Sequence, residues 1–137
     1  MLKHLLVGYD GSDTSRQAFR FAMELARLCK GRVRVVSVLQ VAEGGDTCAL
    51  MMTEATGQLV RDLMDELKTL EPDATVLADP AVIHGNPGDV LLGQIQPHGI
   101  DHIVIGHTER GALARWLLGS VSGDVLARSH VPVTVVR

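Results

Sequence analysis

Short apolar runs alternate with longer amphipathic stretches along the whole chain. The runs are rich in Val, Leu and Ile, which predicts strands over residues 5–9, 33–39, 75–83, 103–105 and 133–136. Between them, apolar residues recur three or four positions apart. This spacing predicts helices over residues 13–29, 48–70 and 87–98, and a last helix that opens at Gly119-Ser120. Strand and helix therefore alternate from one end of the sequence to the other.

Capping signals mark several of these boundaries. Ser12 is predicted to cap the first helix, and Lys30-Gly31 supplies a basic last turn with a glycine stop. Asn86 and Pro87, with Asp89 after them, predict a compact helix start. Pro80 removes a backbone donor from the third strand, which favours an edge position or a strand that starts late.

Each predicted helix carries one apolar face that we expect to be buried. In the first helix this face consists of Ala18, Phe21, Ala22, Leu25 and Cys29. In the second it consists of Met52, Ala55, Leu59, Leu63, Leu67 and Leu70, with Met64 filling gaps in the core. In the third and fourth it consists of Leu91, Leu92, Ile95, Leu118, Val121 and Val125.

This alternation predicts an α/β fold, a single domain over residues 1–137. Repeated strand–helix units build a doubly wound, five-stranded parallel sheet with helices on both faces and right-handed crossovers. The first strand then neighbours either the third or the fourth. Ligands bind outside the carboxyl ends of the strands at such a switch point. If the first and fourth strands are neighbours, Asp10 and the segment 106–122 meet in one crevice.

The composition of the chain argues against several classes of function. Apolar residues make up 46% of the chain and aromatic residues 3%, so the core is expected to be aliphatic. The formal net charge is −3 without long charged runs, so we expect no nucleic-acid partner. No apolar run approaches the roughly 20 residues of a membrane span, and no signal peptide opens the chain. We therefore expect no membrane insertion, a cytoplasmic location and, at Cys29 and Cys48, reduced thiols.

The segment 103–122 carries the strongest candidate chemistry. An apolar strand ends at Gly106, and Gly119-Ser120 then opens a helix, with Ser120 as its expected N-cap. Unpaired N–H groups at a helix start favour an anion, so this arrangement is typical of a phosphate cradle. Ordinary turn and cap signals produce the same pattern. Asp10 has two interpretations as well: a ligand acceptor at a strand end, or a turn residue that bonds its own backbone.

The spacing from Gly106 to Gly119-Ser120 resembles the G-x2-G-x9-G-[ST] signature of the universal stress protein family, in its ATP-binding branch. The segments 117–122 and 131–136 are also similar to that family. The resemblance implies the strand order 3-2-1-4-5 and a regulatory or signalling module in the stress response. It also implies ATP, with or without Mg²⁺, as the cofactor, and a homodimer formed through the last strand, Val133, Thr134, Val135 and Val136.

The resemblance also assigns site residues. The adenine base is expected at the ends of the first two strands, at Gly8, Tyr9, Asp10 and Val41. The phosphates are expected at Gly106, His107, Gly119, Ser120, Val121 and Ser122.

One position departs from the signature, because Glu109 stands where its second glycine belongs. A carboxylate there opposes a bound anion by about 1–4 kcal/mol. The first alternative is therefore a nucleotide-free stress protein that dimerises or binds partners. The second is a weak ATP hydrolase, and the third is a flavodoxin-like carrier, for which the chain has few aromatic residues. Phosphate-loop, zinc-ligand, GxSxG and HExxH patterns are all missing from the sequence, so we expect neither an enzyme nor a metal site.

Overall fold

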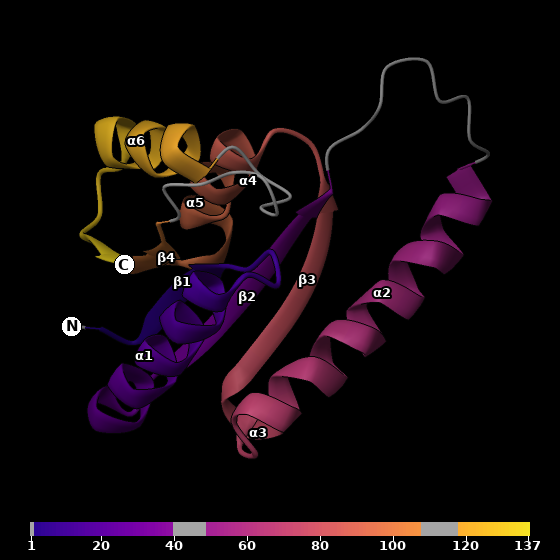
Figure 1. Cartoon of the computed structure of the whole chain (residues 1–137), viewed down its shortest axis with the longest axis horizontal. Coiled ribbons are helices and arrows are strands. Elements are labelled where there is room, and N and C mark those ends of the chain that lie inside the picture. Colours follow the sequence, from indigo (N-terminus) through magenta and orange to yellow (C-terminus); the bar gives the residue numbers. More distant parts are fainter. Residues whose placement is uncertain (1, 40–48, 108–117) are drawn as a thin grey trace.

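The computed structural model describes residues 2–39, 49–107 and 118–137, together with the side chains of these residues except 49–55 and 118–120. Within these ranges the strands are β1 (His4–Gly8), β2 (Arg32–Leu39), β3 (Ala78–His84), β4 (His102–Gly106) and β5 (Val133–Val136). The helices are α1 (Asp13–Cys29), α2 (Ala49–Leu70), α3 (Ala74–Leu77), α4 (Pro87–Gly93), α5 (Ile95–His98) and α6 (Leu118–Arg128). Figure 1 shows their arrangement.

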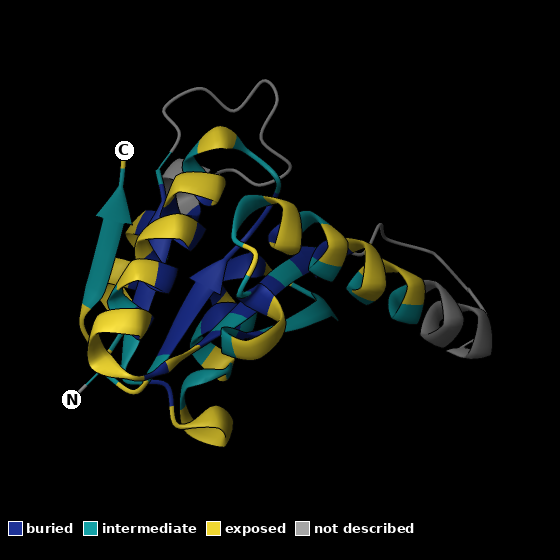
Figure 2. Ribbon diagram, turned by 90° about the horizontal axis from the view of Figure 1, so that it is seen from below, coloured by how far each residue is buried: buried dark blue, intermediate teal, exposed yellow. Residues whose placement is uncertain are grey.

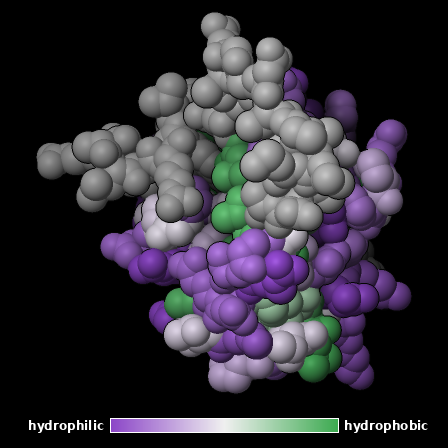
Figure 3. Space-filling view, turned by 90° about the vertical axis from the view of Figure 1, so that its right-hand side faces the viewer, coloured by the Kyte–Doolittle hydropathy of each residue, from purple (hydrophilic) through white to green (hydrophobic). Residues whose placement is uncertain are grey.

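The strands form one parallel sheet in the order β3-β2-β1-β4-β5. The predicted α/β fold and its strand order are therefore confirmed. Pro80 lies on the edge strand β3, level with Val35 of β2, as expected for a residue that lacks an N–H group. Figure 3 views the side where α2 and β3 lie, and the described surface there is mostly hydrophilic around a narrow hydrophobic strip.

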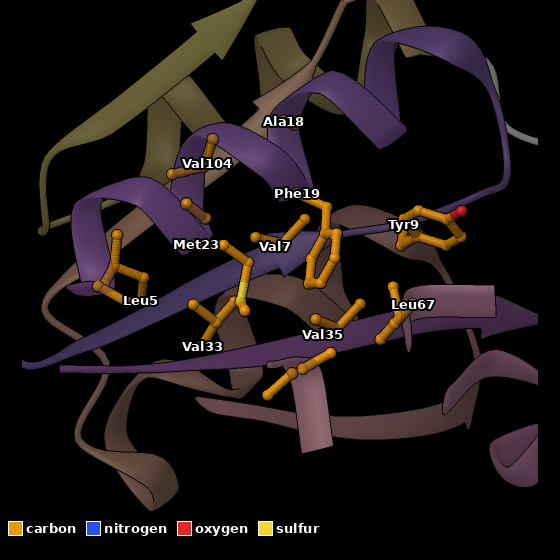
Figure 4. Close-up of a cluster of buried hydrophobic side chains, with 14 of the residues drawn as sticks. Leu5, Val7, Tyr9, Ala18, Phe19, Met23, Val33, Val35, Leu67 and Val104 are labelled. Atoms are coloured by element: carbon orange, nitrogen blue, oxygen red, sulfur yellow. The ribbon is translucent and has the colours of Figure 1, made fainter. Parts of the chain in front are cut away.

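The sheet is covered on both faces, and each face has its own core. Residues of β1, β2 and β4 pack with α1, α2 and α3 on one face. On the other face they pack with α4 and α6. Leu5, Leu6 and Val7 of the central strand β1 are fully buried, which explains why this strand is an unbroken apolar run. Figure 2 shows the buried strands between partly exposed helices, and Figure 4 shows the first core, in which Phe19 and Met23 lie over β1 and β2.

The buried face of α1 differs from the expected one. The residues buried are Ser15, Ala18, Phe19, Ala22, Met23 and Ala26. Phe21 is 39% exposed and Cys29 is exposed, so their predicted burial is wrong. Two apolar stripes compete along this helix. The stripe with alanines at positions 18, 22 and 26 faces the sheet, because small side chains let the helix approach it closely.

The helix α2 also buries fewer of its apolar side chains than predicted. Leu63 and Leu67 of α2 are buried and Met64 packs against the first core, but Leu59 is 38% exposed. Residues 74–77 form α3, so the third strand begins at Ala78 rather than at Thr75.

The predicted N-caps of α1 and α4 are confirmed, but the predicted glycine stop of α1 is not. Ser12 Oγ accepts a hydrogen bond from the Ser15 N–H at 3.3 Å, and Asn86 Oδ1 accepts from the Asp89 N–H at 3.2 Å. At the end of α1, however, Lys30 adopts the left-handed conformation, with φ +56°. Gly31 serves a different purpose from the predicted helix stop. A Cβ there would lie 2.7 Å from the carbonyl oxygen of Lys3, so the glycine allows the chain to pass beside β1.

None of the helices in the described ranges combines the length and hydrophobicity that a bilayer-spanning segment requires.

His102 links β4 to the edge strand β5, and its burial predicts that the stability of the protein depends on pH. His102 Nε2 lies 2.7 Å from Thr134 Oγ1, and its buried Nδ1 has no partner among the described residues. Burial lowers the pKa of His102 below its ordinary value of 6.5, although Asp101 opposes this shift. The unfolded chain therefore binds more protons there. The contribution of His102 is complete above the unfolded pKa and is lost as the pH falls through the folded pKa.

We expect His102→Gln to flatten the fall in the free energy of unfolding as the pH drops below 6.5, the ordinary pKa of histidine. Urea denaturation at a series of pH values measures this slope. His130→Gln, which changes an exposed histidine, is the control. An unchanged slope in His102→Gln would contradict this assignment.

Candidate functional site

The topology places the switch point of the sheet between β1 and β4. After β1 the chain builds outward through β2 and β3, then returns to the other side of β1 to form β4 and β5. β1 pairs with β4 from Leu5 opposite His102 to Val7 opposite Val104. If this register is continued three residues beyond the last pair, Asp10 stands opposite His107. The carboxyl ends of these strands are where doubly wound sheets bind ligands.

Asp10 follows β1 and is 7% exposed. Its Oδ1 accepts a hydrogen bond from the Ser12 N–H at 2.9 Å, which is the turn interaction that the sequence allowed. Its Oδ2 is buried and finds no donor among the residues that the structure describes. A buried acceptor without a partner is costly, so Asp10 offers one preformed acceptor to a ligand.

Gly8 and Tyr9 hold the end of β1 in the sheet. Gly8 pairs with Val36, and the Tyr9 N–H donates to the Val36 carbonyl oxygen at 2.9 Å. The Tyr9 ring lies in the first core, at right angles to Phe19, and its hydroxyl donates to Glu66 Oε1 at 2.8 Å. Burial, followed by the bond to Glu66, raises the pKa of Tyr9. The ring therefore packs in the core as a neutral phenol.

Gly106 is the last residue of β4, and it lies beside the first turn of α1. A Cβ at this position would lie 2.6 Å from the carbonyl carbon of Thr14 and 2.9 Å from the backbone nitrogen of Ser15. The glycine therefore allows the first turn of α1 to pack against the strand end. This packing requirement is independent of any ligand.

His107 connects the end of β4 to β5 and to α6. Its backbone N–H donates to the Val136 carbonyl oxygen at 2.7 Å, and its Nδ1 lies 3.0 Å from Ser122 Oγ. Ser122 is 4% exposed and Val121 is 7% exposed. Sequence reasoning missed this histidine–serine contact, because no local pattern relates two residues 15 positions apart.

The start of α6 differs from the prediction in one respect. The helix already includes Leu118, so Gly119 and Ser120 lie within its first described turn, and Ser120 is not the N-cap. Val41 and Glu109 lie outside the described residues.

These residues form two polar groups at the ends of adjacent strands. Asp10 supplies an acceptor beyond β1, whereas His107 and Ser122 supply groups able to donate beyond β4. The arrangement suits a ligand with a donor at one end and an anionic acceptor at the other. Within the described ranges, no group of three His, Cys, Asp or Glu side chains could hold a metal ion.

Comparison with known proteins shows the family to which the chain belongs. The model of the universal stress protein family matches residues 1–137. The chain is 27% identical over 144 residues to Universal stress protein MJ0531 of Methanocaldococcus jannaschii, with all of this chain and 83% of that protein covered.

Solved structures share the fold. Universal stress protein UspA from Lactobacillus plantarum has 22% identity and a TM-score of 0.76, covering 99% of this chain and 98% of that one. A universal stress protein in complex with cAMP has 23% identity and a TM-score of 0.71, covering 98% of this chain and 97% of that one. The universal stress protein from Archaeoglobus fulgidus in complex with dAMP has 23% identity and a TM-score of 0.67, with both chains fully covered. Because the family model matches this chain over all of residues 1–137, the chain belongs to the universal stress protein family.

Proposed function

We propose that this chain binds an adenine nucleotide at the β1–β4 switch point and acts as a nucleotide-responsive regulatory module in the cytoplasm. The observation that carries the proposal is the buried Oδ2 of Asp10, which lacks a partner among the described residues. The exocyclic amine of adenine is a donor that would satisfy it. Two relatives of the same fold are complexes with the adenine nucleotides cAMP and dAMP, which supports this choice of base.

The phosphates are proposed to lie at the ends of β4 and α6. Gly106 and His107 stand at the strand end, and the backbone of Gly119, Ser120 and Val121 belongs to the start of α6. A helix start attracts phosphate through its N–H groups and its dipole. ATP, with or without Mg²⁺, is the ligand we propose, since the family resemblance of this segment is to the ATP-binding branch.

Titration calorimetry of ATP with Mg²⁺ into the wild type and into Glu109→Gly tests this proposal against its first alternative. Micromolar binding by the wild type supports a nucleotide site. Binding by Glu109→Gly alone favours the nucleotide-free module, closed by one carboxylate. Absence of heat in both would refute the site. For the second alternative, a hydrolase, the test is steady phosphate release that Asp10→Ala and Ser120→Ala abolish.

We further propose a homodimer formed through Val133, Thr134, Val135 and Val136. β5 is an edge strand whose residues are all partly exposed. The carbonyl oxygens of Pro132 and Val136 accept from β4, so by alternation the N–H groups of Val133 and Val135 point away from it. An unpaired edge of this kind is a template for a second strand, and a second copy would cover it.

Val135→Pro is expected to convert the dimer to a monomer, because it removes an outward N–H group while leaving the bonds to β4 in place. Size-exclusion chromatography with light scattering at micromolar concentration measures the mass. Val135→Ala keeps the N–H group and should remain dimeric. A monomeric wild type, or a dimeric Val135→Pro, would contradict the proposed interface.

A further inference from the structure

The edge strand β5 is apolar except at Thr134, and a histidine holds this one hydroxyl in place. Nε2 of His102, on β4, lies 2.7 Å from Thr134 Oγ1. The other ring nitrogen of His102 is buried and has no partner among the described residues, so the ring is committed to Thr134. Val136, on the same side of the strand as Thr134, packs against the first core. Thr134 is therefore a fixed polar group at the open edge of the sheet, which Figure 2 shows beside the C-terminus.

The bonds between β4 and β5 limit how a second copy can pair with this edge. The carbonyl oxygens of Pro132 and Val136 accept from β4. By alternation, both backbone groups of Val133 and both of Val135 point outward. In an antiparallel pair, residues with outward groups must face one another to exchange hydrogen bonds. The possible arrangements of two copies therefore differ only in the residue that lies on the two-fold axis.

The surroundings of β5 favour an axis at Thr134. An axis nearer the start of the strand draws on the backbone of Val131, whose N–H donates to Ser129 Oγ and whose carbonyl oxygen accepts from the same hydroxyl. An axis nearer the end draws on Arg137, which follows the last residue of the strand. With the axis at Thr134, the two outward residues of each copy pair with those of the other, and no backbone outside β5 is needed.

We propose that the homodimer has its two-fold axis at Thr134, so that the two Thr134 hydroxyls, each held by its own His102, form a hydrogen bond across the interface. Residues that face one another in this way form a non-hydrogen-bonded backbone pair, in which the side chains come closest and threonines bond one another. This inference rests on the homodimer of the proposed function. It adds the register of the two copies and the side chains that fix it.

The hydrogen-bonding capacity of these groups suits such a chain. A hydroxyl carries one proton and two lone pairs, and the contact with His102 uses one of these at each Thr134. In one direction across the interface, Nε2–H of the first His102 donates to its Thr134, and this threonine donates to the second Thr134. The second threonine then donates to Nε2 of its own His102. All four side chains are paired, and the two histidines carry their protons on different ring nitrogens.

The same hydroxyl distinguishes this register from its neighbours, which the valines of β5 do poorly. Moving the axis by one residue would set each Thr134 opposite Val136 or Pro132 of the other copy. The hydroxyl would then be covered without a partner from that copy, which costs free energy. A single polar side chain in an apolar interface fixes the register of coiled coils in this way.

Disulfide cross-linking reads the register directly. The variants Thr134→Cys, Val133→Cys and Val135→Cys are made in a chain whose two native thiols are removed by Cys29→Ser and Cys48→Ser. Facing residues of a non-hydrogen-bonded pair have Cα atoms about 4.5 Å apart, which is within disulfide range. We expect Thr134→Cys to form a disulfide-linked dimer on mild oxidation. The other two thiols are each displaced by two residues from their own copy and should stay unlinked.

Thr134→Val tests the hydroxyl itself, because it keeps the branched shape and removes the polar group. We expect it to raise the dissociation constant of the dimer about tenfold, the effect of one hydrogen bond. Light scattering over a dilution series measures this constant. Thr134→Ser retains a hydroxyl and is the matched control, which should dimerise more tightly than Thr134→Val. A Thr134→Val dimer as tight as the wild type would overturn the bond across the interface.

The remaining failures are distinguishable. A dimer that cross-links through Val133→Cys or Val135→Cys, but not through Thr134→Cys, would overturn this inference and leave the homodimer through β5 intact. A dimeric protein in which none of the three thiols cross-links would show that the copies do not meet at β5. That result, or a monomeric wild type, would overturn the proposed homodimer interface and this inference together.

Discussion

Gly106→Ala is expected to lower the free energy of unfolding by about 2–3 kcal/mol, the cost of overpacking a site that cannot relax. The added Cβ would meet the backbone of Thr14 and Ser15 at 2.6–2.9 Å. Backbone atoms in the first turn of a helix cannot rotate away as a flexible side chain can. The helix must therefore move from the strand, at a cost that is a large part of a typical stability of about 5–15 kcal/mol.

Urea denaturation followed by circular dichroism measures this change. Gly93→Ala is the matched control, because a Cβ at that position would meet nothing within 4 Å. We expect Gly93→Ala to be neutral or slightly stabilising. A Gly106→Ala variant as stable as the wild type would show that the contact between β4 and α1 is looser than described here.

Asp10→Asn is expected to weaken ATP binding about 100-fold without lowering stability. The remaining oxygen can still accept from the Ser12 N–H, so the turn is kept. At the position of Oδ2, however, an amide donor would face the exocyclic amine of adenine, which is also a donor. Because the substitution removes a buried carboxylate oxygen that lacks a partner among the described residues, the free energy of unfolding should be unchanged or higher.

Calorimetric titration and urea denaturation of the same protein preparation give both quantities. Asp13→Asn makes the same chemical change in the first turn of α1, where the Asp13 side chain is 92% exposed, and should retain ATP binding. A loss of stability in Asp10→Asn together with unchanged affinity would assign Asp10 to the turn alone.

The fold could be predicted from the sequence because its signals agree with one another. Buried parallel strands are continuous apolar runs, and Ser12 and Asn86 mark helix starts through local side-chain bonds. The failures occurred where two local solutions are equivalent. The sequence offers two apolar stripes on α1, and only packing against the sheet determines that the stripe with small residues is buried. Gly31 is likewise required by the close approach of the chain to Lys3, and it is not the helix stop that its position suggested.

The candidate site was only partly visible in the sequence for a related reason. Strand ends are local features, so Asp10 and Gly106 could be identified from the apolar runs before them. What surrounds each residue depends on distant segments. The unpartnered oxygen of Asp10, the packing of Gly106 against α1 and the contact of His107 with Ser122 arise only when β1, β4 and α6 come together.

The most direct test of the account is the affinity of the wild type and of Asp10→Asn for ATP and for inosine triphosphate, measured by calorimetry. Inosine carries an oxygen acceptor where adenine carries the exocyclic amine, so the group at that position cannot donate to the carboxylate of Asp10. We expect the wild type to bind ATP at least about tenfold more tightly than inosine triphosphate, and Asp10→Asn to lose this preference. Equal affinity of the wild type for both nucleotides, or the same preference in both proteins, would contradict the assignment of Asp10 as the acceptor for the adenine base.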